Sequence, residues 1–318
     1  MKAVVFDRRL RFAADAPQPL PKPGEALIRI QMAGICNTDL ELIKGYMDFS
    51  GIPGHEFIGR VEEASGASSE WVGKRVVGEI NCGCGTCRFC RSNLARHCRD
   101  RTVVGISGRG GCFAEFMTLP MENLYVVPDR LSDEEAVFCE PLAAAFEVLE
   151  QVHIRPGEQV LVLGDGKLGL LLGMALRTSA GRVTLAGRHA AKLAIAAAAG
   201  VKTVPAATPA AGAFDIVVEA TGTPQGRAEA VKYVRPRGTL VVKSTVVDTE
   251  DWDWTPIVVN ELTVVGSRCG RFGPALQALQ DTILVRPLIT AVYPLERALE
   301  AFEHARRPEA VKVLLDMR

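Results

Sequence analysis

The chain has 318 residues, enough for two domains, and its 48% hydrophobic and 23% charged content is typical of an ordinary soluble globular protein. Its formal net charge is +0, so no overall field favours nucleic acid or an acidic membrane surface. The first residues contain too short an apolar run for a signal peptide, and no uncharged stretch reaches transmembrane length. We therefore expect a cytoplasmic protein that binds neither nucleic acid nor membrane.

Residues 1 to about 127 carry short alternating apolar runs broken by proline and glycine, a pattern typical of β-structure. Ala26–Ile30 and Lys74–Val77 are two such runs. A helix is expected to begin after Ser132, because Ser132 can cap it and Glu135 completes a capping box. The helix should break or restart at Pro141.

The clearest signal is a short apolar run, Gln159–Leu163, which is typical of a fully buried parallel strand. A G-x-G-x-x-G turn follows at once and opens an apolar helical stretch; it contains Gly164, Gly166, Lys167, Leu168 and Gly169. Gly164 would make the turn, Gly166 would let the backbone approach a pyrophosphate, and Gly169 would let the helix pack against the strand. The helix N-terminus would offer free N–H groups to the phosphates. This context predicts a dinucleotide site, with a tight turn that binds no ligand as the alternative.

Strands and helices then alternate as far as Gly266. The expected strands are Val183–Ala186, Phe214–Glu219, Gly238–Lys243 and Leu262–Val265, and the expected helices are Ala190–Ala199 and a second one ending near Val234. This alternation predicts an α/β, doubly wound and mostly parallel sheet. Further on we expect helices around Pro274–Asp281 and Leu295–Ala305 and a last strand at Ala310–Leu315. This tail is too short for its own domain and should fold back onto the N-terminal part.

Five of the nine cysteines fall between Cys82 and Cys98. An odd number of cysteines without an export signal argues against a disulfide framework. The spacing Cys84-x2-Cys87-x2-Cys90-x7-Cys98 puts four soft ligands in one loop, which suits a tetrahedral structural zinc. Unrelated buried cysteines and an iron–sulfur cluster are the alternatives, but the long last gap differs from a ferredoxin run. Cys82 is expected to pack and not to ligate.

A second metal site is indicated by residues that lie far apart in the sequence. Cys36 lies in GICNTD, His55 and Glu56 lie in GHEFIG, and Glu140 lies in CEPLA. Each has an ordinary explanation alone: a buried cysteine, a loop histidine or a helix-terminal glutamate. Together they form the ligand set of a catalytic zinc with an exchangeable position. Cys139, next to Glu140, stays an alternative ligand.

In this order the motifs resemble the zinc-dependent medium-chain dehydrogenase/reductase family, which includes alcohol, sorbitol and threonine dehydrogenase-like proteins. The resemblance covers nearly the whole chain and rests on several motifs: Cys36-x-Thr38-Asp39, Gly54-His-Glu56-x2-Gly59, the four-cysteine lobe, Glu140-Pro-Leu-Ala143, the glycine turn and Val218-Glu-Ala-Thr-Gly222. The Glu-Pro-Leu form is closer to the polyol and threonine dehydrogenase branch.

The resemblance implies a GroES-like β-rich catalytic domain over residues 1–135, with residues 268–318 folding back onto it, and a Rossmann domain over residues 136–267. It implies that Cys36, His55 and either Glu56 or Glu140 hold a catalytic zinc, and that Thr38 passes the substrate proton outward. It also implies that Thr221 and Arg268 bind the cofactor.

Two departures from the family pattern bear on substrate and cofactor. The segment Leu40–Pro53, which normally helps to wall the substrate pocket, is shorter than usual, so substrate size cannot be transferred. Gly187 stands where the second Rossmann strand usually ends in an acid that selects the ribose 2′-hydroxyl. Arg188 follows it and Lys192 is near, which favours NADP over NAD unless Arg188 merely faces solvent.

The expected activity is hydride transfer between an alcohol (polyol, secondary alcohol or amino-alcohol) and NAD(P), with one catalytic and one structural zinc. The partner is a small alcohol or carbonyl substrate. The alternatives are a zinc-free NADPH quinone or enone reductase and a non-catalytic NAD(P)-binding protein on the same fold. The resemblance also implies a homodimer or homotetramer, formed through the edge strand near Leu262–Gly266.

Overall fold

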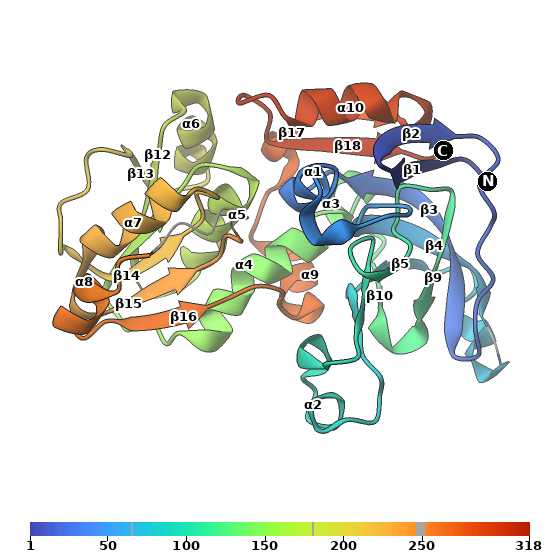
Figure 1. Cartoon of the computed structure of the whole chain (residues 1–318), viewed down its shortest axis with the longest axis horizontal. Helices are drawn as coiled ribbons and strands as arrows, with labels where there is room; N and C mark the ends of the chain where they lie inside the picture. Colours follow the sequence, from blue (N-terminus) through green and yellow to red (C-terminus); the bar gives the residue numbers. More distant parts are fainter. Residues whose placement is uncertain (65, 180, 246–251) are drawn as a thin grey trace. The chain divides into compact units, whose positions relative to one another are not determined.

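The computed structural model describes residues 1–64, 66–179, 181–245 and 252–318 (Figure 1). The chain divides into two compact units, one formed by Met1–Glu140 with Phe272–Arg318 and the other by Pro141–Arg271. Helix α4 (Cys139–Gln151) crosses the boundary between them in sequence. No helix in these described ranges is long and apolar enough to cross a membrane.

The first unit is built on a mostly antiparallel sheet in the order β10-β5-β4-β3-β18-β17, with β9 also paired to β3. Its strands are β1 (Ala3–Asp7), β2 (Arg9–Ala13), β3 (Glu25–Gly34), β4 (Glu56–Ala64), β5 (Arg75–Gly78), β6 (Asn81–Cys82), β7 (Thr102–Val104), β8 (Gly108–Arg109), β9 (Phe116–Pro120), β10 (Leu124–Val126), β17 (Ile289–Pro294) and β18 (Lys312–Asp316). Its helices are α1 (Asn37–Leu42), α2 (Arg88–Arg91), α3 (Asp133–Ala136), α9 (Phe272–Asp281) and α10 (Ala298–Ala305). Strand β3 is buried along most of its length because β4, β9 and β18 all pair with it.

The C-terminal tail packs within the same unit as the N-terminal part of the chain. Strand β18 pairs antiparallel with β3, and Leu314 lies opposite Gly34. Helix α10 packs on β17, β18 and β2, so the two ends of the chain lie side by side in the view (Figure 1). Strand β17 was not expected from the sequence, because Ile289–Pro294 alternates between half-buried and exposed positions and offers no continuous apolar run.

The predicted capping box and helix restart are both found. The Ser132 hydroxyl accepts a hydrogen bond from the Glu135 N–H, and the Glu135 carboxylate accepts one from the Ser132 N–H, at the start of α3. Helix α4 begins at Cys139, so Pro141 falls in its first turn, where a missing N–H costs little.

The second unit is a parallel sheet in the order β13-β12-β11-β14-β15-β16. Its elements are β11 (Gln159–Leu163), α5 (Lys167–Leu176), β12 (Arg182–Gly187), α6 (Ala190–Ala198), β13 (Lys202–Pro205), β14 (Phe214–Glu219), α7 (Pro224–Tyr233), β15 (Val234–Val242), α8 (Thr255–Val259) and β16 (Thr263–Gly266). This order is that of a dinucleotide-binding fold, whose ligand crevice lies beyond the carboxyl ends of the strands. Strand β13 was missed because it is short and half-exposed and runs into the Ala/Pro stretch that follows.

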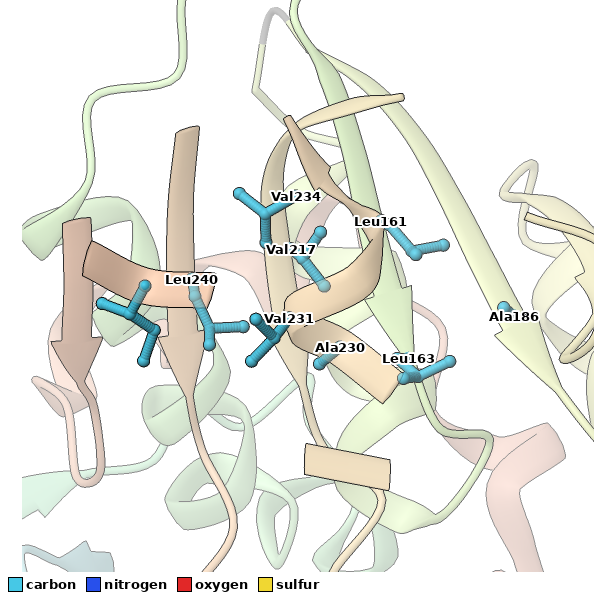
Figure 2. Close-up of a cluster of buried hydrophobic side chains, with 9 residues drawn as sticks. Leu161, Leu163, Ala186, Val217, Ala230, Val231, Val234 and Leu240 are labelled. Carbon is cyan, nitrogen blue, oxygen red and sulfur yellow. The ribbon is translucent and has the colours of Figure 1, made fainter. Parts of the chain in front are cut away.

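Alternate residues of the central strands build the core of this sheet. Leu161 and Leu163 of β11 point to the same face as Val217 of β14 and pack with Ala230 and Val231 of α7 (Figure 2). Right-handed crossovers place α5 and α6 on the opposite face from α7. The strand ends that follow this buried layer are therefore held rigidly.

Candidate functional site

Three candidate metal ligands converge in the first unit. Cys36 caps α1 just after β3, while His55 and Glu56 lie at the start of β4. Strands β3 and β4 pair with Gly34 opposite Glu56, so the end of one strand adjoins the start of the other. One donor atom from each of Cys36, His55 and Glu56 lies within 4.8 Å of the other two.

The donors of this group fit a zinc ion. His55 is 3% and Glu56 1% exposed, and Glu56 Oε1 makes no hydrogen bond to the residues that the structure describes. A buried carboxylate oxygen without a partner is costly, and a cation would satisfy it. Sulfur, imidazole nitrogen and carboxylate oxygen are the ligands that catalytic zinc takes.

Asp39 lies next to the histidine of this group, and the sequence indicated it only as part of the Cys36-x-Thr38-Asp39 motif, without a role. Its Oδ2 accepts a hydrogen bond from the Cys36 N–H at 2.8 Å, and its Oδ1 lies 3.2 Å from His55 Nδ1. The contact between Asp39 Oδ1 and His55 Nδ1 is electrostatic, because neither atom makes a well-directed hydrogen bond to a described residue. Burial lowers the pKa of His55, but the charge of Asp39 outweighs it and holds that pKa well above its usual range. A carboxylate in this position orients an imidazole ligand.

Lys312 is a functional residue that the sequence did not reveal. It reaches Glu56 from β18, and both side chains are 1% exposed. Burial lowers the pKa of Lys312, but the charges of Glu56 and Cys36 raise it by more than burial lowers it. The net pKa is raised, so the amine stays charged. Its apolar neighbours in the sequence gave it the pattern of an ordinary strand residue.

Thr38 and Glu140 were also predicted to act at this site, but they differ in their relation to the group. The Thr38 hydroxyl lies 3.7 Å from the Cys36 sulfur, where it could exchange a proton with a ligand beside that sulfur. Glu140 is buried in the first turn of α4, and its donor atoms are not part of the group of Cys36, His55 and Glu56. This geometry favours Glu56 over Glu140 as the third ligand. The thiol of Cys139 lies against the Phe272 carbonyl at 3.9 Å, and burial raises its pKa.

The four-cysteine lobe forms a second group of donor atoms. The sulfurs of Cys84, Cys87, Cys90 and Cys98 all lie within 4.8 Å of one another. Hydrogen bonds from Thr86 lower the pKa of Cys84 to about 6, while burial raises that of Cys90 to about 12. A metal binds the deprotonated form of cysteine, and zinc is the ion that suits four sulfurs.

Two residues close to the four cysteines in the sequence are not part of this group of donors. Cys82 is 4% exposed, and burial raises its pKa to about 11, so its thiol packs in the interior. His97 is exposed on the lobe surface.

The glycine turn of the second unit has the local geometry of a phosphate cradle. Gly164 has φ +119°, and a Cβ at Gly169 would lie 1.9 Å from the Gly164 carbonyl oxygen. Packing therefore requires glycine at both positions. A Cβ at Gly166, by contrast, would meet nothing within 4 Å. This open space at the N-terminus of α5 fits a cofactor pyrophosphate close to the backbone.

The other predicted cofactor residues lie at or just beyond the carboxyl ends of the same strands. Lys167 and Leu168 begin α5, Arg188 follows β12 and is exposed, Lys192 is 7% exposed on α6, and Thr221 and Arg268 follow β14 and β16. Thr221 is fixed by Glu219, whose Oε1 accepts hydrogen bonds from the Thr221 N–H at 2.7 Å and hydroxyl at 2.6 Å. The buried amine of Lys243 donates to the Arg268 carbonyl at 2.8 Å and so holds the loop after β16.

Both units of the chain resemble known proteins. Residues 22–129 match the model of the alcohol dehydrogenase GroES-like domain, and residues 135–317 match the glucose dehydrogenase C-terminus. D-arabinitol dehydrogenase 1 of Uromyces fabae is 30% identical over 98% of this chain and 96% of its own. L-threonine 3-dehydrogenase of Coxiella burnetii is 30% identical over 94% of each chain.

Solved structures with the same fold include two dehydrogenases. A protein from Sinorhizobium meliloti described as a zinc-binding dehydrogenase, solved with NADP, is 27% identical with a TM-score of 0.89 and covers 99% of this chain and 98% of its own. Alcohol dehydrogenase of Thermus sp. ATN1 is 29% identical with a TM-score of 0.90 and covers 100% of both chains.

The chain belongs to the zinc-dependent medium-chain dehydrogenase/reductase family. The predicted fold class, a GroES-like domain with a Rossmann sheet, is confirmed. The protein is an oxidoreductase that transfers a hydride between an alcohol and NAD(P).

Proposed function

We propose that Cys36, His55 and Glu56 hold the catalytic zinc and that the four-cysteine lobe holds a structural one. The observation that carries the first assignment is the convergence of three donors, with His55 and Glu56 buried and Cys36 half-buried, around a Glu56 oxygen that lacks a hydrogen bond among the described residues. A zinc ion there would act as a Lewis acid that lowers the pKa of a substrate hydroxyl or polarises a carbonyl.

The chain's own residues then handle the proton and the charge. Thr38 Oγ1, beside Cys36, takes the proton from the substrate hydroxyl and passes it outward. Asp39 keeps the His55 ring oriented, and Lys312 offsets the charge of Glu56. The open face at Gly166 admits the cofactor pyrophosphate.

The substrate we propose carries a second polar group next to the reacting hydroxyl, as a polyol or a β-hydroxy amino acid does. Two relatives that are 30% identical support this class, one named for D-arabinitol and one for L-threonine. The cofactor we propose is NADP in preference to NAD, because Gly187 offers no acid to the ribose while Arg188 and Lys192 offer positive charge.

The test is the initial rate of NADP⁺ and NAD⁺ reduction with polyols, β-hydroxy amino acids and simple secondary alcohols. Turnover that requires Cys36 and favours the first two classes with NADP⁺ supports the proposal. Turnover restricted to simple alcohols, or faster with NAD⁺, contradicts the substrate or the cofactor assignment respectively.

A second copy of the chain is the partner that the edge of the parallel sheet fits. Strand β16 forms that edge, and the neighbouring α8 exposes Val258 at 73% and Val259 at 72%. Pairing of two β16 strands would cover both the edge and this apolar surface. Light scattering of the wild type and of Val259→Asp tests it: a dimer or tetramer that the variant dissociates is expected, and a monomeric wild type overturns it.

A further inference from the structure

The second residue of the glycine turn is an aspartate whose side chain is buried. Asp165 is 7% exposed, and its carboxylate crosses to the turn between β12 and α6. There it accepts a hydrogen bond from the His189 N–H at 2.6 Å and lies 3.0 Å from His189 Nδ1. One carboxylate thus ties the phosphate turn to the turn that carries the predicted cofactor cation.

The same side chain accounts for the glycine at the end of β12. A Cβ at Gly187 would lie 2.4 Å from Asp165 Oδ2 and 2.5 Å from Asp165 Cβ, closer than atoms of this kind approach. The backbone itself does not call for glycine, since Gly187 lacks a positive φ. Residue 187 is therefore glycine because Asp165 fills the space where its side chain would be. An acid cannot stand at both positions.

The negative charge of Asp165 is paired with His189 within the protein. Burial raises the pKa of Asp165, but the hydrogen bonds from His189 lower it by more than burial raises it. The net pKa is lowered, so the carboxylate stays ionised. Both oxygens already face donors of the β12–α6 turn, which leaves little capacity for a ribose hydroxyl. Arg188, which lies between Gly187 and His189 in the chain, is exposed.

We propose that Asp165 and His189 form a latch that positions Arg188 to bind the cofactor 2′-phosphate, so that Asp165 is a positioning residue for cofactor choice. The inference rests on the proposed preference for NADP. In the alternative role, Asp165 itself binds the ribose, as an acid at the end of the second strand does. Its carboxylate would then repel the 2′-phosphate, so its removal should raise the affinity for that phosphate instead of lowering it.

The experiment uses the adenosine end of the cofactor alone, which avoids any dependence on zinc or on substrate. Calorimetric titration of the full-length protein with adenosine 2′,5′-bisphosphate and with 5′-AMP gives the ratio of the two affinities. The probes share the 5′-phosphate, so damage to the glycine turn weakens both alike, whereas loss of the Arg188 position weakens only the first. Asp165→Ala and His189→Ala should each lower the ratio by about tenfold, the effect of one charge-assisted hydrogen bond.

Asp165→Asn should retain part of the ratio, since its amide oxygen can still accept from the His189 N–H. Asp215→Ala is the matched control. Asp215 also joins a backbone N–H, that of Gln159 at 2.7 Å, to a cation, Arg235 at 2.7 Å, but it does so at the amino ends of the strands. Its loss should leave the ratio unchanged. If Asp165→Ala does not fold, His189→Ala carries the test, because that side chain is 39% exposed and little of the core depends on it.

The outcomes separate the latch from the cofactor preference. A wild type that binds both probes equally overturns the NADP preference and the latch with it. A wild type that prefers the bisphosphate, with both variants keeping that preference, overturns the latch alone. A gain in bisphosphate affinity in Asp165→Ala overturns it in favour of the ribose-binding role.

Discussion

Lys312 and Glu56 form an ion pair buried from solvent, although they are 256 positions apart in the sequence. The pair joins the C-terminal tail to the start of β4, one residue after His55. It therefore couples the position of a proposed zinc ligand to the docking of the last strand. Although Lys312 lies far from Glu56 in the sequence, it gives the buried carboxylate a partner of opposite charge.

Lys312→Met should lower the free energy of unfolding by about 3–5 kcal/mol, because it leaves the Glu56 charge buried without its partner. Urea denaturation measures this. Lys2→Met is the control, since it breaks another ion pair to the C-terminal segment, Lys2 with Glu296 at 2.6 Å, whose side chains are about half exposed. That loss should stay below about 1 kcal/mol. Equal effects of the two variants would contradict the buried role of Lys312.

Asp39→Asn should weaken zinc binding at the catalytic site by about 10–100-fold, because the imidazole of His55 loses the carboxylate that orients it. Competition with a chelator, followed by metal analysis of the protein, measures this. Glu41→Gln, on the same helix but paired with Lys44 at the surface, is the control and should change nothing. An unaltered affinity in Asp39→Asn would show that His55 does not depend on it.

Cys87→Ser should remove the lobe zinc and lower thermal stability, while cofactor binding by the other unit persists. Cys82→Ala is the comparison, since Cys82 is buried beside the lobe but outside the donor group. It should keep the full zinc content and lose only packing energy. Loss of zinc from Cys82→Ala, or none from Cys87→Ser, would overturn the assignment of ligands.

Much of this arrangement follows from local patterns in the sequence. The capping box at Ser132, the strand–turn–helix at Gly164 and the cysteine spacing from Cys84 are all short-range signals, and the structure contains each of them. Lys312, the Asp165–His189 contact and the role of Asp39 beside His55 were missed, because each depends on tertiary contacts between segments that sequence spacing does not relate. Strand β13 was missed because it is half-exposed, so it lacks the apolar run that marks a buried strand.

The glycine turn offers a pair of substitutions with opposite expected effects. Gly169→Ala should prevent folding or destabilise the protein strongly, because its Cβ would meet the Gly164 carbonyl at 1.9 Å. Gly166→Ala should fold with unchanged stability, since its Cβ meets nothing within 4 Å, yet it should lose cofactor affinity. Thermal melts and NADP⁺ titration measure the two effects. Full cofactor affinity in Gly166→Ala would argue against a pyrophosphate at this turn.

Gly187→Asp tests the steric relation between Asp165 and the strand end. Alone it should destabilise the protein, because the new Cβ would lie 2.4 Å from Asp165 Oδ2. In an Asp165→Gly background the same change should be tolerated and should shift binding toward NAD⁺, since an acid then stands at the ribose position. Chemical denaturation of the wild type, the two single variants and the double variant shows whether the effects are non-additive. Additive effects would mean that the two positions do not compete for space.

The central claim is that Cys36, His55 and Glu56 hold a zinc ion on which turnover depends. The most direct test measures two properties of the wild type and of Cys36→Ser. Mass spectrometry gives the number of zinc ions per chain, and NADP⁺ reduction with a panel of polyols gives the turnover. The wild type should hold two zinc ions and turn over, while the variant should hold one, bind NADP⁺ normally and be inactive. A variant that keeps both ions, or that keeps wild-type turnover, would contradict the claim.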